Sequence, residues 1–116
     1  MTANEIIEEA LKEVEAEYRF NHFETEEAVN PPFICYTNPE TRNFYADGKV
    51  YMTIQTINIE LYTDQKTKEL EEKIEAALQK RGIGWRKAEV YIEEENMYEV
   101  LYEMEVKEDA GNDEEE

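Results

Sequence analysis

The residues of this chain that could carry catalysis are few and isolated. The chain contains no serine, one histidine, His22, and one cysteine, Cys35. Nucleophilic catalysis by a Cys–His pair would rest on these two residues alone. Cys35 lies in a short apolar run, where a buried thiol that packs as a small hydrophobe is expected. Carboxylates are so numerous that pairs at suitable distances arise by chance, so the sequence predicts no catalytic site and no enzyme.

No metal or cofactor site is expected either. The acidic segment 93–96 and the acidic C-terminus lack the ligand spacing and central glycine of a Ca²⁺ loop. Gly48, Gly82 and Gly84 have explanations as turn and cap residues, and no phosphate-cradling pattern is present. A single cysteine permits neither an internal disulfide nor a Cys-rich zinc site, which fits a reducing compartment.

The large aromatic side chains are the most informative feature. The eight tyrosines lie mostly in or beside predicted strands, as in "FICYTNPETRNFYADGKVY", "INIELYTD" and "AEVYIEEENMYEVLYEMEV". A chain that places large side chains on sheet surfaces and has few nucleophiles or metal ligands is typical of proteins that bind or assemble. An interaction protein is therefore the starting hypothesis.

Negative charge is concentrated at the two ends of the chain. The formal net charge is −18; residues 1–27 hold nine acids and two bases, and residues 107–116 hold six acids and one base. The ordinary explanation is a solvated surface that keeps the protein soluble, and the alternative is a mimic of nucleic-acid charge. Direct nucleic-acid binding is not expected without a basic stripe. No signal peptide and no apolar run of ~18 residues is present, so we expect a soluble, cytoplasmic protein with no membrane partner.

An amphipathic helix is predicted at the start of the chain. Thr2 and Glu5 have the spacing of a capping box. An apolar stripe at three-to-four spacing follows from Ile6 to Tyr18, with an acidic opposite face. Residues 21–32 then form a polar connection. We expect this helix to lie on the core along one side.

Three strands are predicted next. They are a short strand at 33–36, a second at 44–46 and a long strand at 50–62. The last two form a hairpin around Asp47-Gly48, a dipeptide suited to a type I′ turn. Apolar alternation in the long strand changes phase between Ile54 and Ile57. Either a bulge or a strong twist near Gln55-Thr56 reconciles the two halves, or one half is buried by its own sheet and the other by a neighbouring subunit.

The second helix is predicted from Thr63-Asp64 to Gly82, with Leu70, Ile74, Ala77 and Leu78 facing the core and a Schellman stop at Gly82. Strands at 85–92 and 97–106 follow. The fold class is therefore α+β: a two-layer sandwich with a mostly antiparallel sheet of about five strands and two helices, in the order α-βββ-α-ββ. Residues 1–106 form one domain, and residues 107–116 form a disordered acidic tail.

Residues 31–106 resemble tail completion proteins of long-tailed phages and prophages of Gram-positive bacteria, also called tail terminator or head-to-tail joining proteins. The segments that carry the resemblance are Asn43-Phe44-Tyr45-Ala46-Asp47, Glu60-Leu61-Tyr62-Thr63-Asp64 and Tyr91-Ile92-Glu93 with Met97-Tyr98. The resemblance implies a structural virion protein that caps the tail tube as a six-membered ring and joins it to the head connector. It places the protein in the host cytoplasm during assembly and then in the virion neck.

A ring needs heterologous interfaces between copies, and such patches favour aromatic residues, Met and Arg. The candidates are Phe44, Tyr45, Tyr51 and Tyr62 around the first hairpin, with Trp85, Arg86 and Tyr98 at the other sheet edge. The alternative is that some of these are ordinary core or surface aromatics.

The rival hypothesis is an acidic decoy that inhibits a host nucleic-acid-binding enzyme. It predicts a ridge of carboxylates on the first helix, at Glu8, Glu9, Glu13 and Glu15. The assembly hypothesis predicts that Tyr45→Ala or Tyr62→Ala blocks ring formation and that deletion of 108–116 is tolerated. An α+β domain with some other partner remains a third possibility.

Overall fold

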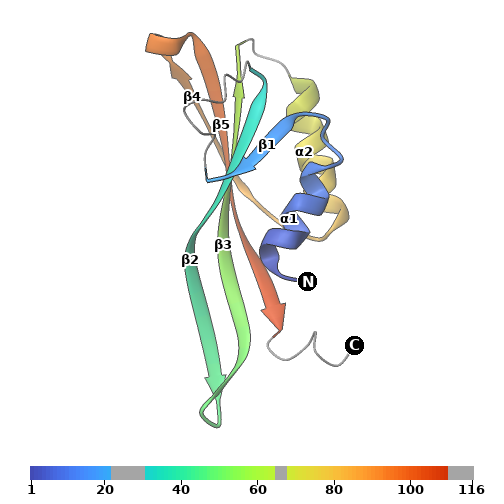
Figure 1. Cartoon of the computed structure of the whole chain (residues 1–116), viewed down its shortest axis with the longest axis vertical. Coiled ribbons are helices and arrows are strands. Elements are labelled where there is room, and N and C mark those ends of the chain that lie inside the picture. The colour runs from blue at the N-terminus through green and yellow to red at the C-terminus, as the bar shows by residue number, and fades with distance from the viewer. Residues whose placement is uncertain (22–30, 65–67, 110–116) are drawn as a thin grey trace.

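The computed structural model describes residues 1–21, 31–64 and 68–109. Its elements are α1 (Ala3–Leu11), β1 (Glu17–Phe20), β2 (Phe33–Ala46), β3 (Lys49–Thr63), α2 (Lys68–Lys80), β4 (Arg86–Ile92), the 3₁₀ turn η1 (Glu93–Glu95) and β5 (Met97–Asp109). The strands form one sheet in the order β1-β2-β3-β5-β4, with β1 parallel to β2 and the other pairs antiparallel. Both helices lie on one face of this sheet (Figure 1). The predicted α+β class and element order are confirmed.

The first strand, β1, is not one of the strands that the sequence predicts. The predicted helix extends to Tyr18, but α1 ends at Leu11, and Glu15 then adopts a positive φ of 56° that turns the chain. Tyr18 belongs to β1, where it is the register partner of Ile34 in β2. Pairing with β2 therefore decides the structure of residues 17–20, which periodicity alone assigns to a helix.

The predicted strands at 33–36 and 44–46 are the two ends of one strand, β2. The turn-rich segment between them pairs with β3, with a register shift between Thr37 and Glu40. This shift gives β2 an extra residue at Asn38-Pro39, and a proline is tolerated at such a bulge because it has no N–H to donate. The bulge predicted in β3 near Gln55-Thr56 is thus found in the partner strand. From Met52 to Thr63, β3 pairs with β5 without a shift.

The core lies between the helices and the sheet. Its members come from both helices, from the turn after α1 and from the inward faces of β2, β3 and β5: Ala3, Ile7, Leu11, Val14, Ile34, Tyr36, Ile57, Ile59, Leu61, Ile74, Leu78, Val100, Tyr102, Met104 and Val106. Each buried aliphatic side chain contributes about 1.5–3 kcal/mol. Two tyrosines are fully buried, and their hydroxyls find carboxylate acceptors on the helices: Tyr36 donates to Glu8, and Tyr102 donates to Glu75 at 2.9 Å. The predicted inward alternation of β5 is confirmed.

The two helix ends predicted from sequence are present. Thr2 and Glu5 form the capping box at the start of α1. At the end of α2, Ile83 N donates to Leu78 O and Gly82 N donates to Gln79 O, which is the Schellman pattern, with Gly82 at a φ of 73°. The predicted start of α2 at Thr63-Asp64 is wrong for Thr63, which is the last residue of β3. The N-cap of α2 lies outside the described residues.

Gly82→Ala is expected to lower the free energy of unfolding by about 1 kcal/mol, because alanine is strained at positive φ. A Cβ at Gly82 would meet nothing within 4 Å, so the cost is conformational rather than steric. The matched control is Gly84→Ala, where φ is not positive and the space is also empty. Chemical denaturation should show a loss at Gly82 only. Equal losses at both positions would contradict this account.

The last strand is longer than predicted. β5 continues past Val106, and its residues Lys107, Glu108 and Asp109 are register partners of Ile54, Thr53 and Met52. Glu108 also accepts a hydrogen bond from the backbone N–H of Ala3. Truncation after Asp109 therefore replaces deletion of 108–116 as the change expected to be tolerated. The rest of the predicted disordered tail, 110–116, and His22 lie outside the described residues.

Candidate functional site

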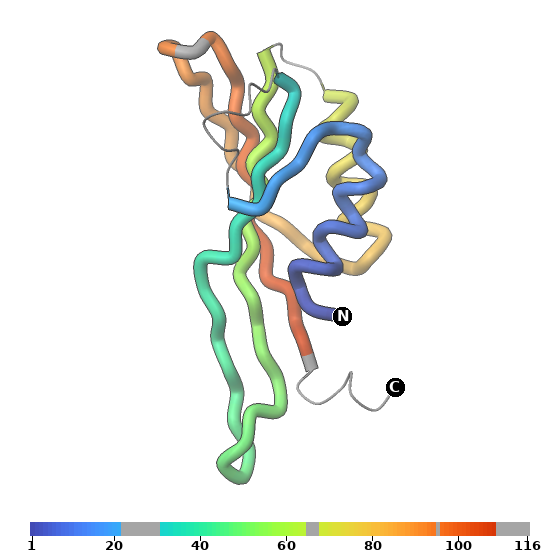
Figure 2. The backbone as a smooth tube through the Cα atoms, in the orientation of Figure 1, coloured from blue at the N-terminus to red at the C-terminus, as the bar shows by residue number. Residues whose placement is uncertain are grey.

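Strands β2 and β3 extend beyond the helices as an arm, residues 40–56, that ends at Asp47-Gly48 (Figure 1). β5 pairs with β3 as far as Met52, so the arm is two-stranded only between Met52 and the turn. Both turn residues have positive φ, 54° and 74°, as the predicted type I′ turn requires. The tube in Figure 2 shows the arm passing beyond the end of β5. The molecule measures 52 × 29 × 24 Å, and its radius of gyration of 15.8 Å exceeds the about 13 Å of a compact chain of this length. The arm therefore projects from the core.

The arm face on the helix side is polar. Thr53 Oγ1 donates to Asn43 Oδ1 at 2.7 Å, and Thr41 Oγ1 donates to Gln55 Oε1 at 2.6 Å. Gln55 Nε2 also donates to Glu108 Oε1 at 3.3 Å, which ties the base of the arm to β5. These side chains satisfy one another, so this face has little need of a partner.

The other arm face is apolar. We call the whole sheet face opposite the helices the open face. Because β3 pairs with β5 without a shift, Met52 and Ile54 lie on the open face, while Ile57, Ile59 and Leu61 face the helices. Phe44 is the register partner of Met52, and all three open-face residues of the arm are half-buried. No described helix covers this face. The phase change in the sequence therefore means that the apolar residues of β3 lie on the open face in the arm and on the helix face beyond it, along one unbroken strand.

A cation and exposed tyrosines border the apolar part of the arm. Arg42 forms an ion pair with Glu105 at 2.8 Å, and its guanidinium lies 5.8 Å from the centre of the Phe44 ring. Tyr45 and Tyr51 are 66% and 52% exposed, and a second register shift puts an extra residue of β3 at Tyr51. Arg, Tyr and Phe are residues that dominate binding energy in interfaces. The arm thus joins three of the predicted interface residues, Phe44, Tyr45 and Tyr51.

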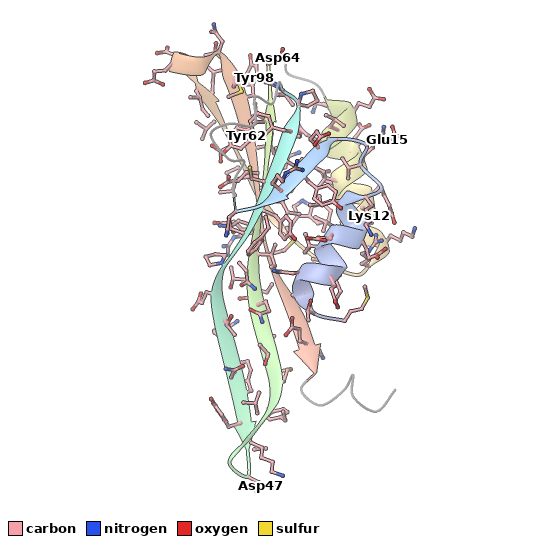
Figure 3. The ribbon with its side chains drawn as sticks, viewed as in Figure 1. Lys12, Glu15, Asp47, Tyr62, Asp64 and Tyr98 are labelled. Atoms are coloured by element: carbon pink, nitrogen blue, oxygen red, sulfur yellow. The ribbon has the colours of Figure 1, made fainter. Side chains whose placement is uncertain are left out.

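Tyr62 is not part of that group. The sequence places it around the first hairpin, but Tyr62 and Tyr98 lie at the opposite end of the molecule from Asp47 (Figure 3). β3 is fifteen residues long, and Tyr62 lies next to its last residue, so an extended strand places Tyr62 far from the turn. The Tyr62 ring stacks on Phe33 with centroids 5.0 Å apart, and the Tyr98 ring tilts against Tyr91 at 4.9 Å.

Trp85 and Arg86 lie where the chain enters β4. Trp85 packs edge-on against Tyr102 with ring centroids 6.4 Å apart, so part of its ring belongs to the core. Arg86 is exposed and forms an ion pair with Glu103 at 2.8 Å. Both residues line a surface hollow of about 530 Å³, together with Glu40, Thr56, Gly84, Glu103, Met104 and Glu105. The seven predicted interface residues thus occupy three separate regions.

Sequence reasoning missed three exposed apolar residues, Phe20, Val90 and Tyr91, which are 44%, 55% and 46% exposed. Val90 and Tyr91 belong to β4, an edge strand of the sheet. The signal in the sequence is that Val90 and Tyr91 are adjacent in a strand, so they point to opposite faces, and a sheet with one covered face leaves at least one of them exposed.

Two carboxylates meet on the open face near Tyr62. Glu60 accepts a hydrogen bond from Tyr62 Oη at 3.0 Å, and Glu99 is the register partner of Tyr62 on β5. Burial and then the negative charge of Glu60 raise the pKa of Glu99. The folded chain therefore holds two acids side by side at a cost in stability.

Glu99→Gln is expected to raise the free energy of unfolding at pH 7 by about 0.2–1 kcal/mol, the range for a cross-strand charge pair. A raised pKa means that the folded state binds the proton more tightly, so the penalty is complete above the folded pKa and absent when Glu99 is protonated. Urea unfolding at pH 7 and at about pH 3 should therefore show the gain at pH 7 only. Glu72→Gln, on the exposed surface of α2, is the control. A gain of equal size at both pH values would contradict a charge effect.

No group of three or more His, Cys, Asp and Glu side chains in the described part of the chain could hold a metal ion, and no described helix is long and apolar enough to span a membrane. Cys35 is buried, as predicted.

Comparison with known proteins gives a likeness in fold. No protein-family model matches this chain, and no curated protein sequence matches it. Among solved structures, the chain is similar to one from "Virion of native gene transfer agent (GTA) particle", with a TM-score of 0.57 and 10% sequence identity. The likeness covers 90% of this chain and 85% of the other. The two chains therefore share a fold, in which the helices, the sheet and most of the chain length take part.

Proposed function

We propose that this chain is a structural protein of a phage-like virion. In this proposal it caps the tail tube as a ring of six copies and joins the tube to the head connector, first in the host cytoplasm and then in the virion neck. The observation that carries the proposal is the projecting arm, whose apolar face of Phe44, Met52 and Ile54 is covered by neither helix. The shared fold with a virion chain and the resemblance of residues 31–106 to tail completion proteins support it.

The physical argument concerns what an isolated arm would cost. A hairpin that leaves the core gains nothing from its own helices and exposes apolar side chains to water. Burial of Phe44, Met52 and the exposed Tyr45 against another protein would recover that free energy. The arm is therefore best explained as a part that binds another chain: another copy, the tail tube protein or the connector.

The acidic-decoy hypothesis gains no support from α1. Its four carboxylates would need to form an unpaired ridge that resembles phosphates. Instead, Glu8 accepts from Tyr36, Glu9 pairs with Lys12, and Glu15 pairs with Lys73 at 3.0 Å. Glu13 pairs with both Arg81, at 2.7 Å, and Lys80, at 3.3 Å. Glu8 thus joins α1 to the sheet, and Glu13 and Glu15, which follow α1, join its end to α2 and the turn after it, while the Glu9–Lys12 pair is local. Three of the four acids therefore serve the fold.

Electron microscopy of particles from an induced lysogen that lacks this gene tests the proposal. The expected result is filled heads beside unjoined or overlong tails. Restoring the gene in trans should restore joined particles, which controls for effects on neighbouring genes. Intact, normally tailed virions without the gene would rule out the proposed function.

A further inference from the structure

The two ends of the open face differ in the sign of the charged side chains that have no ion-pair partner among the described residues. One end, which we call the carboxylate end, holds Glu60 and Glu99 with Tyr62 and Leu101. The other, the arm end, holds Phe44, Met52 and Ile54 with the cations Arg42, Lys49 and Lys107. Both ends belong to the same pair of strands, because β3 and β5 stay in register from Met52 to Thr63.

The carboxylate end lacks a compensating cation. Glu60 and Glu99 are diagonal neighbours, since Glu60 is opposite Leu101 and Tyr62 is opposite Glu99. No ion pair joins either carboxylate to a lysine or arginine within the described residues. The pKa of Glu99 is raised by burial and by Glu60, which is what two uncompensated acids produce. Apolar rings adjoin the acids, because Phe33 stacks on Tyr62. This end therefore combines negative charge with aromatic surface.

The arm end lacks a compensating anion at its lysines. Lys107 is the register partner of Ile54, and Lys49 directly follows the turn at the tip of the arm. Both side chains are exposed, and neither forms an ion pair with the residues that the structure describes. By contrast, Lys12, Lys73, Lys80 and Lys87 all have carboxylate partners, and Lys68, on α2 away from the open face, is the other described lysine without an ion pair. In a chain of net charge −18, two unpaired lysines beside an apolar surface are an exception.

We infer that the arm end of one copy binds the carboxylate end of the next copy. Lys49 and Lys107 would supply the cations that Glu60 and Glu99 lack, and Phe44 and Met52 would pack against Tyr62 and Leu101. The inference rests on the self-assembling role proposed above and names its contact surfaces. Two different surfaces meet in this contact, so it is heterologous and repeats from copy to copy.

Net charge explains why the contact must be local. Two copies of charge −18 repel at long range, so only a site where cations meet anions directly favours association. Raising the salt from about 0.1 M to about 1 M shortens the Debye length from about 10 Å to about 3 Å. Partly buried ion pairs are screened less than long-range repulsion, so moderate salt is expected to assist association and not to abolish it.

The experiment is a charge swap followed by sedimentation velocity. The first variant carries Lys49→Glu and Lys107→Glu, and the second carries Glu60→Lys and Glu99→Lys. Each variant alone places like charges in the contact, so self-association should weaken about 100-fold or more. An equimolar mixture should associate again, because each reversed end meets a reversed end of the other variant. The matched control reverses Lys80 and Glu9, exposed residues of the two helices, and should associate as the wild type does.

Several outcomes would overturn the inference. Wild-type protein that stays monomeric at all concentrations measured would do so, as would single-end variants that associate normally. A mixture that stays monomeric although both variants show wild-type circular dichroism and melting would also overturn it. The gene deletion distinguishes a failure of this contact from a failure of the proposed function. If the deletion gives unjoined tails but the charge-swapped variants do not associate when mixed, the proposed function stands and the contact is wrong. If the deletion gives normal virions but the charge-swapped variants associate when mixed, the contact stands and the proposed function is wrong.

Discussion

Met52→Asp is expected to abolish the joining of heads and tails while the chain stays folded. Met52 lies on the apolar arm face beside Phe44, far from the core under the helices, so the fold does not depend on it. An interface residue at the centre of a contact costs about 2–4 kcal/mol when removed, which is about 30- to 1,000-fold in affinity. A buried, unpaired carboxylate adds to this loss. The measurement is the fraction of joined virions by electron microscopy after complementation with the variant gene.

The control for this change is Asn43→Asp, which adds the same charge to the other face of the arm. Thr53 Oγ1, which donates to Asn43 Oδ1 at 2.7 Å, can donate equally to the new carboxylate. Virion joining should remain near the wild-type level. If Asn43→Asp and Met52→Asp are equally harmful, charge on the arm matters and its apolar face does not. If neither is harmful, the arm is not a binding element.

Lys87→Met should produce the largest loss of stability among surface changes. Lys87 Nζ lies 2.9 Å from Glu71 Oε1 and 2.7 Å from Glu75 Oε2, and Glu71 is buried. Loss of the ammonium would leave two carboxylates of α2 facing β4 and Tyr102 without a cation. The cost of breaking a buried pair is about 3–5 kcal/mol, and the partial exposure of Lys87 reduces our expectation to about 2–3 kcal/mol. The melting temperature should fall by about 10 °C or more.

The pH dependence of this loss follows from the pKa values. Burial would raise the pKa of Glu75, but hydrogen bonds from Lys87 and Tyr102 outweigh it and hold that pKa below its ordinary value. Hydrogen bonds to Glu75 and then Glu71 raise the pKa of Lys87. The contribution of Glu75 is therefore present above its unfolded pKa and lost as the pH falls through the folded one. The contribution of Lys87 is present below its unfolded pKa and lost as the pH rises through the folded one.

The difference between wild type and Lys87→Met should accordingly be largest near neutral pH and should shrink as the pH falls through the lowered folded pKa of Glu75. Denaturant unfolding across this range measures it. Lys80→Met is the matched control: Lys80 is exposed, and its partner Glu13 keeps a second cation in Arg81 at 2.7 Å. It should change stability by less than about 0.5 kcal/mol. A pH-independent loss at Lys87 would contradict a stabilising role of the ammonium beside Glu71 and Glu75.

The elements that depend on local signals were determined by the sequence. The capping box at Thr2, the Asp47-Gly48 turn and the stop at Gly82 each act within a few residues, so their chemistry can be identified without knowledge of the fold. The buried alternation of β5 is equally local, because one face of that strand is apolar from Val100 to Val106. These signals suffice for the α+β class, but the three strands before α2 are β1, β2 and β3 and not the three that the sequence predicts.

Only the tertiary structure decided how distant segments pair. The predicted helical stripe runs to Tyr18, yet β2 offers residues 17–20 an edge to pair with, and that pairing makes them β1. The bulge was expected in β3 but lies in β2, because the phase change in β3 required no bulge. The sequence shows that two apolar sets alternate out of phase, but it does not show which face is covered by helices.

The sequence likewise determined one part of the candidate interface, and only the tertiary structure decided the other part. Residue type alone selected Phe44, Tyr45 and Tyr51, because few other positions combine large aromatic rings with a turn. The separation of Tyr62 from them, and its place beside Glu60 and Glu99, depend on the length and register of β3. Composition determines that this chain has surfaces suited to binding. The strand register determines where they lie, because pairing over a whole strand places each side chain on one face or the other.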